Sequence, residues 1–325
     1  MNTQQTTMTA VLNGSIVRPP GFYIIGFSSL PNVNYYLIFL GIVYIVTVLA
    51  NILLITVIWA ERCLHTPKYI AVVNLAVIDV CYSSSMIPKM IDIFLMNSHF
   101  MPYNICLTQM FFVFTFSSLE SISLSILAYD RLVAICFPLR QHAINTNSRM
   151  LIIIATAWVV IVSLTGFSVV IMNQLSFCKS ITIYSYFCDY APVFRLACND
   201  YSLHWLTAVT FSMVLIFGPL SFIIVSYVCI IRAMLKIKSV DGRFKAFKTC
   251  TEHLTLVTIF YLPTLILYIL GFFIFAVEVD TRMLNLSLSA CIPPLLNPIV
   301  YTLKTKEIMN RIHILLKMVK ISPKP

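Results

Sequence analysis

Charged residues are what this sequence has least of. Asp, Glu, Lys and Arg make up 10% of its 325 residues, whereas 59% are hydrophobic and the mean hydropathy is +0.91. A soluble domain carries about 25% charged residues. The shortage of charge therefore excludes an ordinary soluble protein and predicts an integral membrane protein.

The sequence also lacks the patterns that carry chemistry in enzymes. It contains no Gly-rich phosphate loop, no Ser-His-Asp arrangement and no zinc-like spacing of Cys and His. We therefore expect no enzymatic activity and no cofactor, apart from a candidate ion described below. Internal repeats and low-complexity tracts are absent too, so the chain is expected to form one domain. Residues 1–34 lack an apolar core of signal-peptide length, so the first membrane helix is expected to direct insertion itself.

Seven long apolar runs are present instead. A helix needs about 20 apolar residues to cross a bilayer, and these runs are continuous, whereas the strands of a membrane β-barrel alternate. The sequence thus predicts an all-α membrane protein, with a seven-transmembrane helix bundle over 35–303 that follows a flexible tail of residues 1–34. The predicted spans are 35–60, 69–95, 105–136, 150–171, 204–231, 247–276 and 283–303.

The chain after the last span is basic and amphipathic. Ile308, Met309 and Ile312 recur at helical spacing between Lys and Arg side chains. A helix with this pattern lies on the membrane surface. Residues 304–325 are therefore predicted to form a short amphipathic eighth helix and a cytoplasmic tail.

The net charge of +10 comes from 22 basic and 12 acidic residues. If the N-terminus is outside, most of the basic residues lie in the inner segments, which is the arrangement that the positive-inside rule requires. Anionic membrane lipid is then the expected partner of these segments, and nucleic acid is not. The same topology places Asn13-Gly14-Ser15 outside, so Asn13 is a predicted glycosylation site.

Four of the ten cysteines fall on the outer side in this topology. Cys106 begins the third span, and Cys178, Cys188 and Cys198 share the long loop of residues 172–201. In an oxidising compartment these four can form two disulfides with three connectivities. A loop tied in this way is expected to cover the bundle as a lid. The remaining six cysteines are expected to be free thiols.

Three polar residues lie deep in the apolar runs. Asn51 must find a partner on another helix, because an amide in lipid cannot stay unpaired. Asp79 and Glu120 are buried acids with no buried Lys or Arg beside them. Such a pair predicts a bound cation or shared protons, and a proton relay in a transporter would show the same pair.

Asp130 and Arg131 end a long segment whose only other charge is Glu120. In one interpretation Arg131 snorkels to the lipid headgroups and Asp130 is its solvated neighbour. In the other, Asp130 restrains Arg131 in a resting state, and Arg131 is released to contact a cytosolic partner. The dipeptide alone leaves both interpretations open.

Taken in order, five motifs from Leu64 onward resemble those of odorant receptors, a branch of the rhodopsin-like (class A) G-protein-coupled receptors. Each motif is weak alone, but five in order and in the right spans are specific. Lys68, Leu132 and Ala50 depart from the family pattern, which has Met, Tyr and Gly there, and the first two lie on the inner face where a G protein would bind. The matches are Leu64-His65-Thr66-Pro67-Lys68-Tyr69, Ala128-Tyr129-Asp130-Arg131-Leu132-Val133-Ala134-Ile135-Cys136, Ser226-Tyr227, the run from Lys245 to Leu254, and Pro294-Leu295-Leu296-Asn297-Pro298.

This resemblance implies a role for each set of residues. It implies disulfides between Cys106 and Cys188 and between Cys178 and Cys198. It implies an inner polar cluster that is a candidate sodium site, made of Asp79, Glu120 and Asn297. The residues that it implies for G-protein coupling and activation are Asp130, Arg131, Tyr227, Asn297, Pro298 and Tyr301. The residues that it implies for ligand binding are Val113, Phe114, Ser117, Ser118, Phe211, Ser212, Leu215, Tyr261, Thr264 and Tyr268.

The expected function is that of an odorant receptor in the plasma membrane. It would bind a small odorant within the helix bundle and activate a heterotrimeric G protein of the stimulatory, olfactory type, which raises cyclic AMP. Val113 stands where amine receptors of the larger family carry Asp, which argues against an amine ligand. The alternatives are a receptor of the same fold for a lipid or peptide, and a cation- or proton-coupled transporter, although transporters usually show repeats.

Overall fold

The computed structural model describes residues 16–27, 30–178, 180–273, 279–304, 308, 309 and 311, without the side chains of 245, 249, 252, 267–273, 279, 303 and 304. The predicted glycosylation site at Asn13 lies outside these residues. So does most of the predicted eighth helix and tail, residues 304–325.

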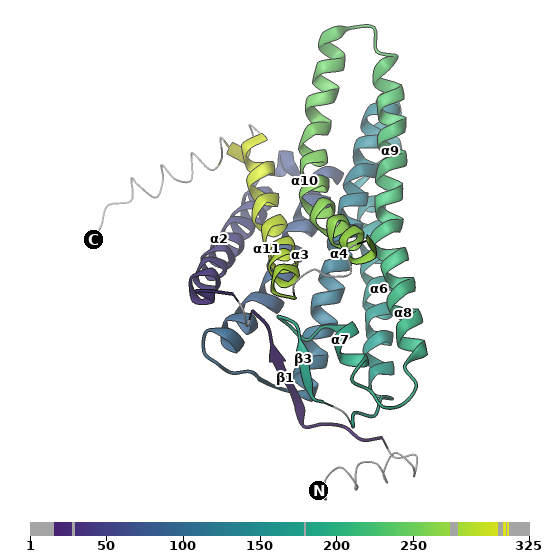
Figure 1. Cartoon of the computed structure of the whole chain (residues 1–325). Coiled ribbons are helices and arrows are strands. Elements are labelled where there is room, and N and C mark those ends of the chain that lie inside the picture. The colour runs from purple at the N-terminus through teal and green to yellow at the C-terminus, as the bar shows by residue number, and fades with distance from the viewer. Residues whose placement is uncertain are drawn as a thin grey trace, which may run out of the picture.

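The described chain is a bundle of long helices (Figure 1). Among the described residues, six helical passes are long and apolar enough to cross a membrane, and a shorter apolar stretch, His253–Ile266, lies within another. This confirms a multi-pass membrane protein. The six passes are α2 (Val33–Ala60), α3 (Pro67–Phe94), α4 (Tyr103–Cys136), α6 (Asn147–Met172), α8 (Ser202–Ser212) continuing through a π-helical turn (Met213–Phe217) into α9 (Gly218–Leu235), and α11 (Val279–Lys304). The shorter apolar stretch lies in α10 (Val240–Phe273).

Local sequence signals account for several helix boundaries. Pro67 is the first residue of α3, where a missing N–H costs nothing. The Thr146 hydroxyl accepts a hydrogen bond from the Arg149 N–H and so caps the start of α6. The predicted spans match these helices to within a few residues, except that α10 starts at Val240, in a stretch expected to be a loop.

Helix α11 continues through three prolines because another helix compensates for one of them. Pro298 has no N–H, which leaves the carbonyl of Pro294, four residues earlier, without its usual helical partner. The Asn51 amide on α2 donates to that carbonyl at 3.0 Å, and also to the Thr47 carbonyl at 2.9 Å. Asn51 is fully buried, and it meets the prediction that its amide would bind a neighbouring helix.

A three-stranded sheet covers one end of the bundle, called the sheet end below. Its order is β2 (Phe100–Pro102), β1 (Gly21–Ile25) and β3 (Thr182–Tyr184), with β1 antiparallel to β2 and parallel to β3. The prediction of a flexible tail over 1–34 is therefore wrong for β1. Its side chains alternate, with Phe22 and Ile24 fully buried, and this period-two pattern is typical of a strand.

Helix α4 is central, because it packs against α3, α6, α9 and α10. The buried side chains form two hydrophobic clusters, one toward the sheet end and one toward the opposite end. At the opposite end α9 and α10 extend beyond the other helices (Figure 1). Short connections complete the fold: α5 (Gln141–Ile144) and α7 (Tyr190–Phe194), with single turns at Arg62–Leu64 and Pro138–Arg140.

Candidate functional site

A cavity of about 390 Å³ opens among the helices toward the sheet end. Its walls come from α4, α6, α8, α10 and α11, and from the loop between α6 and α8. Eight of the ten predicted ligand-binding residues line it, namely Val113, Phe114, Ser117, Ser118, Phe211, Ser212, Leu215 and Thr264. Their role as ligand contacts stays a prediction.

The other two predicted ligand residues lie differently. Tyr261 is buried, and its hydroxyl lies 2.7 Å from that of Ser121, which itself donates to the Leu215 carbonyl at 2.8 Å. Tyr261 is not among the residues that line the cavity, but it contacts Ser121, which does line it. The side chain of Tyr268 lies outside the described residues.

Most hydroxyl groups of the wall are already engaged. Ser168, Ser212 and Thr264 donate to carbonyls of their own helices at 3.1, 2.8 and 3.2 Å. Ser118 makes no hydrogen bond within the described part of the chain. Aromatic and aliphatic side chains such as Phe114 and Phe211 fill much of the remaining wall. A site with apolar walls and few free polar groups suits a small, mostly apolar molecule.

Two charged residues that the sequence analysis did not single out also line the cavity, Asp189 and Arg282. Asp189 directly precedes α7, and its side chain makes no hydrogen bond that caps this helix. Burial raises the pKa of Asp189, whereas Arg282 on α11 opposes that rise. Asp189 lies in a loop and Arg282 in the first turn of a helix, and neither position belongs to a sequence pattern that indicates a cavity. The one available signal is that Asp189 directly follows Cys188, a predicted disulfide cysteine.

Residues 175–198 form the lid over the cavity. Disulfides join Cys106 to Cys188 and Cys178 to Cys198, which are the two pairs that the resemblance implied, and the other six cysteines are free. The Cys188 N–H also donates to the Gln109 side chain at 3.1 Å, so this half of the lid is fixed to α4 twice.

Below the cavity lies the predicted inner polar cluster. The Asn297 amide donates to both carboxylate oxygens of Asp79, at 3.1 and 2.9 Å. Glu120 is buried within electrostatic range of Asp79. Its Oε1 atom and the Ser83 hydroxyl are buried without a hydrogen-bond partner among the described residues. Carboxylate and hydroxyl oxygens are the ligands that hard cations prefer, so these residues fit a bound cation.

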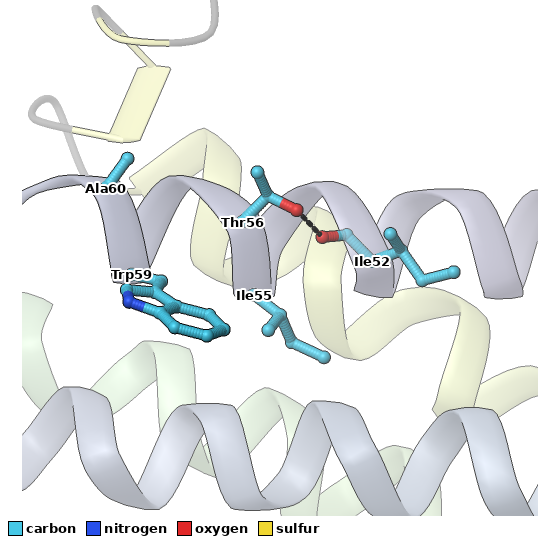
Figure 2. Close-up of a pocket in the computed structure, with 5 residues that line it drawn as sticks. All are labelled: Ile52, Ile55, Thr56, Trp59 and Ala60. Atoms are coloured by element: carbon cyan, nitrogen blue, oxygen red, sulfur yellow. Dashed lines mark hydrogen bonds between the residues drawn. The ribbon is translucent and has the colours of Figure 1, made fainter.

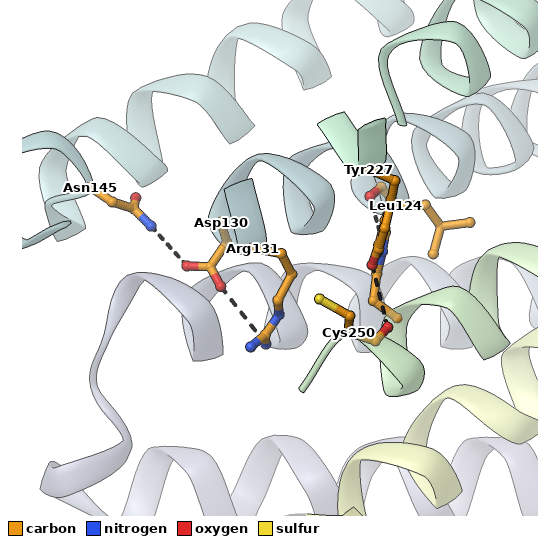
Figure 3. A network of polar contacts seen from close by, with 7 residues as sticks. Leu124, Asp130, Arg131, Asn145, Tyr227 and Cys250 are labelled. Carbon is orange, nitrogen blue, oxygen red and sulfur yellow. Dashed lines mark hydrogen bonds and ion pairs between the residues drawn. The ribbon is translucent and has the colours of Figure 1, made fainter. Parts of the chain in front are cut away.

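Asp130 and Arg131 lie at the opposite end and are both buried (Figure 3). The Asn145 amide donates to Asp130 Oδ1 at 2.8 Å, and Arg131 Nη2 lies 3.8 Å from Asp130 Oδ2. Lys68 is a further cation within electrostatic range of Asp130. Since Arg131 is 6% exposed, its guanidinium is not extended toward lipid headgroups, and its role in activation stays a prediction.

A second polar chain joins three helices beside Arg131. The His253 Nε2–H on α10 donates to the Leu124 carbonyl on α4 at 2.8 Å. That tautomer leaves Nδ1 to accept from the Tyr227 hydroxyl on α9 at 2.9 Å. Tyr227 has a predicted role in activation, whereas His253 has none, although His253 falls within one of the five motifs. Tyr301 is also buried at this end.

A shallow groove on the surface of α2 differs from the cavity (Figure 2). It is lined by Ile52, Ile55, Thr56, Trp59 and Ala60, and Trp59 is 79% exposed. The Thr56 hydroxyl donates to the Ile52 carbonyl at 2.8 Å, so it offers no free proton. This apolar face suits contact with lipid tails.

Comparison with known proteins agrees with this geometry. A sequence model of the family described as "Olfactory receptor" matches residues 40–318. The chain is 32% identical to Olfactory receptor 2AT4 of Homo sapiens over 299 residues, which cover 91% of this chain and 92% of that one. It is 35% identical to Olfactory receptor 1L4 of Homo sapiens, with 88% and 92% covered, and 33% identical to Olfactory receptor 1f45 of Rattus norvegicus, with 91% and 95% covered.

The match extends over most of the chain and includes the helices that form both the cavity and the polar networks. Chains of this family are receptors and not enzymes, as the absence of catalytic patterns led us to expect. The chain belongs to the olfactory receptor family of the rhodopsin-like G-protein-coupled receptors.

Proposed function

We propose that this chain binds a small odorant in the cavity of about 390 Å³ and activates a G protein of the stimulatory, olfactory type. The observation that carries the proposal is this cavity, closed by the lid on one side and walled by α4, α8, α10 and α11. A bound molecule that touches several helices can favour one arrangement of them over another.

Coupling would take place at the opposite end. There, Arg131 is held in a buried position next to Asp130, while Tyr227 and His253 join α9 and α10 to α4. A ligand that favours separation of the ends of α9 and α10 would release these contacts and expose Arg131 to the G protein. The basic inner segments support an orientation with the N-terminus outside a plasma membrane.

The inner polar cluster adds a second proposal, a sodium ion held by Asp79, Glu120 and Asn297. Support comes from the unpartnered Glu120 oxygen and from the two adjacent carboxylates, because neighbouring buried acids require a cation or a proton between them. An ion bound only in the resting arrangement would oppose activation.

The alternatives are less well supported by the same observations. A peptide ligand would need more room than this cavity offers. A transporter would require a route for its substrate past the buried cluster, and Asn297 and Asp79 join α11 to α3 directly across that route.

The test is Arg131→Ala, expressed in cells together with an olfactory-type G protein. We expect the odorant-stimulated rise in cyclic AMP to be abolished while the receptor still reaches the cell surface. The reason is that the Arg131 guanidinium is needed for contact with the G protein, after it has left Asp130, and not for folding. Arg149→Ala is the matched control. Its guanidinium is exposed and donates to the Ala143 and Ile144 carbonyls, so this variant should keep the response.

Full signalling by Arg131→Ala would contradict the coupling role. Uptake of a labelled odorant, measured in the same cells, separates a receptor from a transporter, since a receptor raises cyclic AMP without accumulating its ligand.

A further inference from the structure

The mouth of the cavity carries an arginine whose guanidinium is not held by any hydrogen bond or ion pair of the described residues. Arg282 lies in the first turn of α11, lines the cavity and is exposed. Its guanidinium makes no hydrogen bond or ion pair with any residue that the structure describes. Asp280, two residues earlier, is buried and has an interaction of its own.

The charges around this mouth favour an anion. Asp189 is the acidic residue of the cavity wall, and it lies within electrostatic range of both Arg282 and Arg195. Two cations are therefore close to one carboxylate of the wall.

Below Arg282 the wall is apolar and aromatic, with Phe114, Phe187 and Phe211 among its residues. A cavity of about 390 Å³ lies within the range of about 300–1,000 Å³ that is typical of small-molecule sites. A carboxylic acid with a chain of about eight carbons is a small molecule of the class that such sites bind.

We propose that the ligands of this cavity are medium-chain carboxylic acids, with the carboxylate bound by the Arg282 guanidinium and the chain lying among the aromatic side chains. This inference rests on the proposed function for its biological meaning, but the binding itself does not require signalling. An amine is disfavoured because Asp189, the acid of the wall, already lies within electrostatic range of two arginines. Arginine suits a carboxylate because its planar fork donates two parallel hydrogen bonds.

The test measures equilibrium binding of radiolabelled octanoate and of octanol to the full-length receptor in lipid nanodiscs, with binding to empty nanodiscs subtracted. We expect octanoate to bind more tightly than octanol by about tenfold, the contribution of a hydrogen bond to a charged group. Arg282→Ala should remove this difference by weakening octanoate alone. Arg282→Lys should keep part of it, since the charge remains without the fork.

Two further variants separate a ligand contact from a structural effect. Arg195→Ala removes an arginine that is not among the residues lining the cavity and whose guanidinium lies 5.4 Å from the ring centroid of Trp205. It should weaken octanoate binding much less than Arg282→Ala does and leave octanol binding unchanged. Asp189→Asn keeps the size of the side chain but removes a negative charge within electrostatic range of Arg282, so it should tighten octanoate binding and leave octanol unchanged. A merely structural role of the rim would not produce these opposite changes.

Several results would overturn the proposal: octanol bound as tightly as octanoate, no octanoate binding, or equal losses for both molecules in Arg282→Ala. Cyclic AMP assays with the same two molecules distinguish this failure from failure of the proposed function. Octanoate binding that depends on Arg282 without any cyclic AMP response would support the ligand class and contradict the coupling. A cyclic AMP response to neutral odorants without octanoate binding would support the coupling and contradict the ligand class.

Discussion

At the scale of single residues, two buried asparagines of this bundle bind polar atoms on other helices. The Asn51 amide fills the position that Pro298 leaves open at the Pro294 carbonyl, and the Asn297 amide spans both oxygens of Asp79. In an apolar surrounding an unmatched polar group costs more free energy than in water. The unpartnered Glu120 oxygen is therefore a departure that calls for a ligand or a proton.

The sodium proposal is tested by replacing both acids, Asp79→Asn together with Glu120→Gln. This variant removes the charges but keeps most of the hydrogen bonding. In the wild-type receptor, sodium should lower agonist potency relative to the same concentration of potassium or choline, because the ion favours the resting state. The double variant should lose this sodium effect. The measurement is a dose–response curve in membranes at low and high sodium, with ionic strength held constant.

Asp92→Asn is the control for this experiment, since Asp92 forms an ion pair with Lys89 that is partly exposed to solvent. It should retain the sodium effect. If the wild type shows no effect, or if the double variant keeps it, the cluster is not the ion site, and two protonated acids that cross-link helices by hydrogen bonds become the better explanation.

At the scale of elements, the sheet end depends on a close approach between β1 and β2. A Cβ atom added to Gly21 would overlap the main-chain carbonyl oxygen of Met101. Gly21 pairs with Pro102 across the two strands, and Met101 is the next residue along β2. A backbone atom cannot turn aside as a flexible side chain can. The pairing of β1 with β2 therefore depends on glycine at position 21.

Gly21→Ala should accordingly disrupt the β1–β2 pairing and lower both cell-surface expression and thermal stability of the purified receptor. The expected loss is about 1–3 kcal/mol, which is typical of overpacking at a tight contact. Gly218→Ala is the matched control, because a Cβ atom there meets nothing within 4 Å, and this variant should unfold at the wild-type temperature or slightly above. Equal stability of the two variants would show that the strand pairing is dispensable.

At the scale of the whole molecule, the ligand cavity and the coupling end are joined by hydrogen bonds between the same helices. Near the cavity, Ser121 connects α4 with Tyr261 on α10 and with the Leu215 carbonyl. At the opposite end, His253 connects α10 with α4 and with Tyr227 on α9. Both sets of contacts stabilise one arrangement of α9 and α10 relative to α4, so a change at one end can alter the population at the other.

His253→Ala should therefore raise cyclic AMP in the absence of ligand by several-fold. It removes two hydrogen bonds that hold α10 in the resting arrangement, each contributing about 1 kcal/mol, and a shift of this size changes a two-state equilibrium by about tenfold or more. Thr255→Ala is the control, because the Thr255 hydroxyl is exposed and bonds only to the Thr251 carbonyl of its own helix. Unchanged or lower ligand-free cyclic AMP in His253→Ala would argue against a restraining role.

The sequence alone determined the membrane-spanning helices, because a run of about 20 apolar residues has few alternatives to a helix in lipid. It also pointed to the family through motifs such as Asp130-Arg131 and Asn297-Pro298, and it identified Asn51, Asp79 and Glu120 as polar groups in need of partners. These conclusions depend on the composition and order of the chain, which local physical chemistry can interpret.

Only the tertiary structure decided which groups meet. Strand β1 pairs with two segments far away in the chain, and its five residues carry too short a pattern to be recognised alone. Asp189 and Arg282 reach the cavity mouth from a loop and from a helix end, and His253 meets Tyr227 and Leu124 on two other helices. The physical reason is that such contacts depend on how helices pack against one another, and packing is set by the whole bundle rather than by any one segment.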